Sequence, residues 1–164
     1  LKPYNWVTAW VAVTDSNEHN GCMKMWSGSH KGNLKDHDQM FNKGNLLTRG
    51  QTVKNVPIDE TTPLILKAGQ MSLHHPGVVH GSDLNKSNDR RIGFVIQSYI
   101  GTNVKQVLGQ NSVQLARGID DFNYHNKINR PKSLMDINDL KVKKQENKNL
   151  QKIFYAGSQK KGKY

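Results

Sequence analysis

Residues 6–14 alternate between aliphatic side chains and others, a period of two that is typical of a half-buried β-strand. The alternation puts the valines on one face of the strand and Thr8 and Trp10 on the other. Residues 15–21 are polar and end in Asn20-Gly21, a pair that favours the positive φ angles of a tight turn. We therefore expect a hairpin whose returning strand covers residues 21–26.

Short apolar runs bounded by turn residues continue beyond residue 60. Further strands are expected at 64–66, 70–75, 78–82 and 91–100. Short strands at close intervals indicate an all-β sandwich or barrel with minor helix, and not a fold of alternating strands and helices. The intervening residues 27–60 are polar and rich in Gly and Asn, and we expect this long loop to close over a substrate.

The net charge of +11 is concentrated at the C-terminal end of the chain. Residues 141–164 carry eight lysines and one acidic residue, Glu146, whereas acidic residues offset most of the basic ones in residues 1–140. We expect one folded domain over 1–140 and a solvated lysine-rich tail over 141–164, with at most a marginal helix. Basic and aromatic residues do not interleave in the tail, so nucleic acid is not expected as a partner.

The single cysteine, Cys22, excludes an internal disulfide and fits a reducing, cytoplasmic environment. No apolar run is long enough to cross a bilayer, so no membrane partner is expected. The chain begins at Leu1, directly before a strand, without Met or a leader pattern. We therefore expect a domain that is truncated at its N-terminus.

One cluster of residues suggests chemistry, whereas CxxC, HExxH, GxSxG, P-loop and GxGxxG patterns are absent. His80 and Ser82 lie two positions apart, hence on the same face of one strand, and Arg91 follows after a turn. A hairpin would bring Arg91 beside His80 on one sheet. A neutral imidazole suits iron and a guanidinium suits a carboxylate, so one site could hold a metal and a dicarboxylate. The same pair is also common in purely structural settings.

The order and spacing of several short motifs resemble the phytanoyl-CoA dioxygenase family over about residues 4–135. These motifs are Asn20-Gly21-Cys22-Met23, Gly28-Ser29-His30-Lys31, residues 68–76, Val79-His80-Gly81-Ser82 and Arg90-Arg91-Ile92-Gly93. The resemblance implies a double-stranded β-helix, a cupin-like jelly roll. It also implies an Fe(II) site of two histidines and one carboxylate, which leaves positions open for 2-oxoglutarate and O2.

By position, the resemblance implies that His80 is the distal iron-binding histidine and that Arg91 pairs with the far carboxylate of 2-oxoglutarate. Trp10 and Thr8 match positions that line the cosubstrate pocket, although core packing would explain Trp10 as well. Ser82 lies on the face of His80 and is expected to hydrogen-bond the cosubstrate or to orient a ligand.

The resemblance is incomplete in two places. The family's His-x-Asp/Glu motif should come shortly before residues 4–10, and the chain begins after that point. His80 is then one protein ligand of three, so the isolated chain is expected to be inactive. Residues 25–28 also replace the Pro-Gly that often precedes Ser-His in relatives. His74 and His75 are expected to be structural.

The resemblance implies an Fe(II)/2-oxoglutarate-dependent dioxygenase that hydroxylates a small organic molecule and converts 2-oxoglutarate to succinate. Two alternatives remain open. One is a halogenase of the same superfamily, in which a small residue replaces the carboxylate ligand. The other is a non-catalytic β-sandwich that binds a partner through its pocket or its basic tail. The residues upstream of Leu1 would separate these alternatives, whereas the substrate and the oligomeric state remain open.

Overall fold

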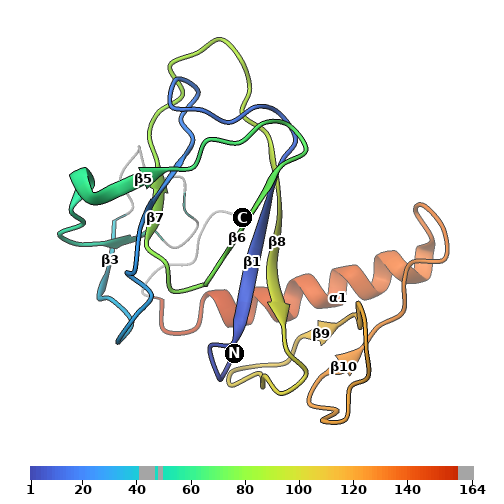
Figure 1. Ribbon diagram of the computed structural model, residues 1–164. Helices are drawn as coiled ribbons and strands as arrows, with labels where there is room; N and C mark the ends of the chain where they lie inside the picture. The colour runs from blue at the N-terminus through green and yellow to red at the C-terminus, as the bar shows by residue number, and fades with distance from the viewer. Residues whose placement is uncertain (41–46, 48–49, 159–164) are drawn as a thin grey trace. The chain divides into compact units, whose positions relative to one another are not determined.

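The computed structural model describes residues 1–40, 47 and 50–158. The chain divides into two compact units, which we call the strand unit and the helix unit (Figure 1). The strand unit comprises Trp6–Asp38 and Thr52–Ile100. The helix unit comprises Leu1–Asn5, Gln39–Gln51 and Gly101–Tyr164.

The strand unit contains two antiparallel sheets of three strands each. The first sheet has the order β6-β1-β8, formed by Met71–His74, Trp6–Ala12 and Gly93–Ile100. The second has the order β5-β2-β7, formed by Thr61–Pro63, Met23–Trp26 and His80–Ser82. Five of the six predicted strands are confirmed with small shifts at their ends.

A small apolar core joins the two sheets. Trp10 and Ala12 from β1 and Met23 from β2 are buried together, and Met25, Leu64 and Leu66 pack against them. Because this cluster takes side chains from both sheets, the face of β1 that carries Trp10 points inward. The sequence predicted that Trp10 and the valines of this strand lie on opposite faces, and the structure confirms this prediction.

The opposite face of the first sheet is apolar and open. Its side chains come from all three strands, because Val11 of β1 pairs with Met71 and Phe94 in register. The exposed members are Met71, Leu73, Phe94 and Ile96. A continuous apolar sheet face of this kind has the composition of a packing surface.

Both predicted hairpins are wrong. β1 and β2 belong to different sheets, and so do β7 and β8. The turn after β1 does contain Gly21 at a φ of 73°, as its sequence predicted. The chain nevertheless leaves one sheet there and enters the other. Sequence periodicity reports which side chains share a face, whereas strand partners depend on the path of the whole chain.

The segment between the early strands and the later ones contains more structure than its composition suggested. Residues 27–60 include β3 (His37–Gln39) and β4 (Gln51–Val53), which pair, and a 3-10 helix, Ile58–Glu60. Residues 41–46 and 48–49 of the expected lid lie outside the described residues. The strand expected at 64–66 is wrong, because the described strand, β5, ends at Pro63.

The helix unit is built around α1, which spans Ile137–Phe154. Asp136 caps its first turn by accepting hydrogen bonds from the backbone N–H groups of Asn138 and Asp139. The expectation of a marginal helix is therefore wrong, since a strong cap and many Lys, Leu and Gln residues favour helix. The predicted boundary at 140/141 falls within α1, and the division into domain and tail remains a prediction.

Two short strands accompany α1 in the helix unit. β9 (Ser112–Val113) pairs in parallel with β10 (Asn126–Lys127). The Glu146 carboxylate on α1 accepts hydrogen bonds from both the backbone N–H and the hydroxyl of Ser112, at 3.0 and 2.9 Å. Among the described residues, no helix is long and apolar enough to span a membrane.

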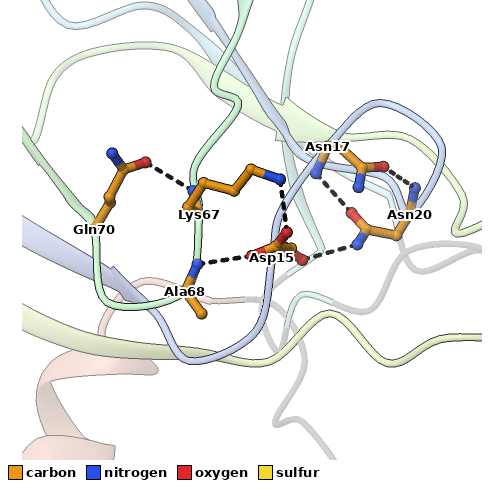
Figure 2. Close-up of polar contacts among 6 residues, drawn as sticks. All are labelled: Asp15, Asn17, Asn20, Lys67, Ala68 and Gln70. Atoms are coloured by element: carbon orange, nitrogen blue, oxygen red, sulfur yellow. Dashed lines mark hydrogen bonds and ion pairs between the residues drawn. The ribbon is translucent and has the colours of Figure 1, made fainter.

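A polar network holds the turn after β1 against the turn before β6 in the strand unit (Figure 2). The Asp15 carboxylate accepts hydrogen bonds from the Ala68 backbone N–H and the Lys67 ammonium, both at 2.9 Å. The Asp15 carbonyl accepts another from the Asn20 amide at 2.8 Å. Two hydrogen bonds lower the pKa of the Asp15 carboxyl below its usual value of 3.8: the larger effect comes from the Ala68 backbone N–H and the next from the Lys67 ammonium.

The network predicts an acid-dependent contribution to stability. Because the pKa of Asp15 is lower in the folded state, its carboxylate stabilises the fold above pH 3.8. This contribution is lost as the pH falls through the folded-state pKa. Asp15→Asn should therefore be less stable than the wild type at neutral pH, and the difference should shrink in acid. Urea unfolding midpoints of the wild type and the variant, measured at neutral pH and in acid, test this prediction.

A matched control is Asp89→Asn, because the described hydrogen bonds of Asp89 are made by its backbone. The control should lack the pH-dependent gap. A constant gap for Asp15→Asn at all pH values would contradict the proposed role of its charge.

Candidate functional site

The candidate site begins on β7, where His80 and Ser82 share one face. His80 pairs with Met25 across β2, and Ser82 pairs with Met23. Directly opposite residues of antiparallel strands point to the same side of a sheet. Both methionines contribute to the core between the sheets, so His80 and Ser82 face the inner side. Both side chains are nevertheless exposed to solvent.

A backbone hydrogen bond defines the tautomer of His80. Its Nδ1 lies 2.8 Å from the Val78 carbonyl oxygen. A carbonyl can only accept, so Nδ1 carries the proton and donates it. Nε2 of the neutral ring is therefore left with a lone pair, which is the form of imidazole that binds metals.

Arg91 reaches the same place from the other sheet, since it lies just before β8. Its Nη2 donates a hydrogen bond to Ser82 Oγ at 3.3 Å. Its guanidinium also lies over the Trp10 indole, 5.7 Å from the ring centroid. The structure thus brings together four of the predicted site residues, His80, Ser82, Arg91 and Trp10. It does so across the gap between two sheets rather than along one, as the sequence had suggested.

The buried indole of Trp10 depends on Gly93, which pairs with Ala12 and lies diagonally across from Trp10 on β8. Trp10 is 7% exposed, and a Cβ added to Gly93 would lie 2.2 Å from its Cζ2 atom. Only a residue without a side chain leaves room for the ring at this position. Thr8, the fifth predicted residue, lies two positions before Trp10 on the same strand, and its hydroxyl donates to the Gln97 carbonyl at 2.8 Å.

His74, which the sequence predicted to be structural, lies next to these residues. It pairs with Thr8 in register, and its ring centroid lies 5.4 Å from that of His80. Burial, and then the neighbouring His80, lower the pKa of His74, so its imidazole is neutral at neutral pH. Alternation along residues 71–74 could have revealed this, because it puts His74 on the same face as Ser72, the partner of Trp10.

These residues fit one part of a metal centre. His80 offers a suitable nitrogen, and Arg91 offers a cation to a carboxylate beside it. No group of three or more His, Cys, Asp or Glu side chains within the described residues is arranged to hold a metal ion. The described part of the chain therefore offers the imidazole of His80 with a second imidazole, His74, near it, and does not by itself contain three such groups in one place.

A separate cavity of about 400 Å3 lies in the helix unit between α1 and residues 111–131. Its walls are mostly amides and aliphatic groups, and none of the predicted site residues lines it. The Glu146 carboxylate, which is part of the wall, is already occupied by Ser112. None of the residues of the candidate site described above lies in this cavity.

The fold is shared with solved non-haem oxygenases. It superposes on the apo form of the non-heme monooxygenase ThoJ with a TM-score of 0.79 and 28% identity, over 92% of this chain and 54% of that one. The nickel complex of ThoJ superposes with a TM-score of 0.74 and 25% identity, over 94% of this chain and 54% of that one. The chain is thus mostly β-stranded, and its fold is similar to that of the non-haem iron, 2-oxoglutarate oxygenases.

The sequence comparison narrows this class to a family. The profile of the phytanoyl-CoA dioxygenase (PhyH) family matches residues 2–93, and the chain belongs to this family. Peroxisomal phytanoyl-CoA dioxygenase of Mus musculus is 31% identical over 86 residues, which are 52% of this chain and 25% of that protein. A probable alpha-ketoglutarate-dependent hypophosphite dioxygenase of Stutzerimonas stutzeri is 28% identical over 107 residues, 64% of this chain and 37% of that protein.

The family predicted from the motifs is therefore confirmed. The chain spans about half the length of ThoJ and about a quarter of the length of the mouse enzyme.

Proposed function

We propose that this chain forms the part of an Fe(II)/2-oxoglutarate-dependent dioxygenase that supplies the distal histidine and the cosubstrate arginine. In this proposal the two facing sheets are part of a double-stranded β-helix, or jelly roll. The complete enzyme hydroxylates a small organic molecule with O2 and converts 2-oxoglutarate to succinate and carbon dioxide. The observation that carries the proposal is the meeting of His80 and Arg91 at Ser82 between the sheets.

Each residue has a separate task in this proposal. His80 offers Nε2 to the metal while Nδ1 is held by the Val78 carbonyl. Arg91 binds the far carboxylate of 2-oxoglutarate, because a guanidinium matches a carboxylate in both charge and geometry. Ser82 accepts a hydrogen bond from Arg91 and keeps its own proton available to donate to the same carboxylate.

The remaining two residues shape the cosubstrate pocket. Trp10 supports the Arg91 guanidinium with its ring face and excludes water from one side of it. Thr8 forms the wall next to His74, with its hydroxyl proton directed to Gln97. When bound, iron supplies the oxidising chemistry with O2, while the chain itself orients the cosubstrate and excludes competing reactions.

The proposal predicts a selective defect for Arg91→Gln in the full-length protein. The variant keeps hydrogen-bond donors but loses the charge, so a carboxylate in the pocket is left without its ionic partner. The KM for 2-oxoglutarate should rise roughly 10- to 100-fold, which corresponds to the loss of a charged hydrogen bond. Succinate release, measured with Fe(II) over a range of 2-oxoglutarate concentrations, provides the test.

The neighbouring Arg90→Gln serves as the matched control, because the described hydrogen bond of Arg90 is accepted by its backbone carbonyl. It should leave the KM unchanged. A wild-type protein that releases no succinate with any candidate substrate would contradict the dioxygenase activity itself. Equal effects at Arg90 and Arg91 would contradict only the assignment of the arginine.

A further inference from the structure

Ser29 is buried in the loop that follows β2 and links this loop to the chain just before His80. It is 7% exposed. Its hydroxyl donates a hydrogen bond to the Trp26 carbonyl at 2.7 Å and accepts one from the Val79 backbone N–H at 2.8 Å. A hydroxyl can donate and accept at the same time, so this one side chain satisfies backbone groups of Trp26 and Val79, which are 53 positions apart in the sequence.

A backbone hydrogen bond also connects these two segments. The Trp26 N–H donates to the Val79 carbonyl at 2.9 Å, so Val79 is held through both its polar groups. Val79 is the residue directly before His80, and Val78, directly before that, provides the carbonyl that accepts the His80 Nδ1 proton. The orientation of this carbonyl therefore depends on how the segment 75–79 is held.

Two further contacts keep this segment in place. The ring of His30 lies 5.2 Å from the ring of His75, centroid to centroid. His75 Nδ1 accepts a hydrogen bond from the Gly77 N–H at 3.0 Å, and a Cβ on Gly77 would come within 3.2 Å of that nitrogen. The loop around Ser29 thus packs against the segment that ends at His80 through a side-chain hydroxyl and a pair of imidazoles.

We propose that Ser29 is a positioning residue for His80. It sets the Val78–Val79 backbone, and this backbone holds the His80 ring with the proton on Nδ1 and the lone pair on Nε2. This inference rests on the proposed function in one respect only, namely that the ligand of Nε2 is a metal ion. It gives the Gly28-Ser29-His30 motif a role at the site through the backbone before His80.

The test uses the full-length protein and three variants. Ser29→Ala removes both hydrogen bonds of the hydroxyl, whereas Ser29→Thr keeps a hydroxyl on the same carbon. Ser16→Ala is the matched control, since Ser16 is 1% exposed and its buried Oγ has no hydrogen-bond partner in the part of the chain that the structure describes. The first readout is the tautomer of His80, measured by long-range 1H–15N correlation of its ring without metal. The second is the dissociation constant of Ni(II), measured by calorimetry without cosubstrate.

Ser29→Ala should lose the uniform Nδ1–H tautomer and bind Ni(II) about 10- to 100-fold more weakly, the usual cost of losing a group that orients a ligand. Ser29→Thr should restore both properties, and Ser16→Ala should change neither. An unchanged tautomer and affinity in Ser29→Ala would overturn the proposal. Equal losses in Ser16→Ala would overturn it too, because the effect would then be one of general stability.

If Ser29→Ala does not fold, hydrogen exchange of the wild type decides the question. The Val79 N–H should then exchange as slowly as the paired amides of β2, and exchange at the rate of an open loop would overturn the proposal. None of these readouts uses turnover. A protein that releases no succinate would therefore refute the proposed function while the tautomer data still decide the role of Ser29.

Discussion

His80→Ala is expected to lower the conversion of 2-oxoglutarate to succinate about a thousandfold in the full-length protein, since a bound metal contributes several kcal/mol to catalysis. Nε2 of His80 is the nitrogen that the hydrogen bond from Nδ1 to the Val78 carbonyl leaves available. Removing this ring deletes a ligand but little buried surface, because His80 is exposed. The thermal unfolding temperature should therefore change little while activity is lost.

The cause of the loss can be separated from misfolding by two measurements. Added imidazole should restore part of the activity of His80→Ala, because the ring can be supplied from solution to an open site. His19→Ala, which removes an exposed imidazole from the turn after β1, should retain full turnover. Full activity in His80→Ala would mean that the metal ligand has been assigned to the wrong residue.

Gly93→Ala is expected to damage both the fold and the use of 2-oxoglutarate. The new Cβ would lie 2.2 Å from Trp10 Cζ2 and 2.6 Å from Nε1, so the buried indole must move. Overpacking of this kind costs about 1–3 kcal/mol of stability. Displacing the ring also removes the support beneath the Arg91 guanidinium, which should raise the KM for 2-oxoglutarate roughly tenfold. Urea unfolding and succinate release measure the two effects.

Two further variants identify the cause. A Cβ on Gly81, on strand β7 of the other sheet, would meet nothing within 4 Å, so Gly81→Ala should be neutral in both assays. Combining Gly93→Ala with Trp10→Leu should relieve the clash and recover stability while the KM stays high. Recovery of both properties in the double variant would show that Trp10 does not support Arg91.

The sequence predicted the local features of the site because these depend on near neighbours. Period-two alternation separated the face of β1 with Trp10 from the aliphatic face, and it put His80 and Ser82 on one face of β7. The turn over residues 15–21 follows from its Asn20-Gly21 pair, and Gly21 adopts a φ of 73°. Each of these features is determined within a few residues, where steric limits on the backbone act directly.

Features that depend on distant parts of the chain were not predicted. The contact between Arg91 and Ser82 spans two sheets, and no local pattern distinguishes this from a hairpin. The tautomer of His80 depends on the Val78 carbonyl and, as we propose, on Ser29. Only the folded path of the chain brings Ser29 to Val79. The roles of the five predicted site residues as iron and cosubstrate contacts remain predictions that the variants above can test.

Because His80 and Arg91 belong to different sheets, the thickness of the layer between the sheets acts as a spacer for the site. Ala12 and Met23 help to fill that layer and touch neither of the two residues in the contacts described above. A larger or smaller side chain at either position would change the separation of imidazole and guanidinium without altering their chemistry. If the dicarboxylate binds as proposed, the length that the site accepts could be changed by substitutions in the core, far from the binding groups themselves.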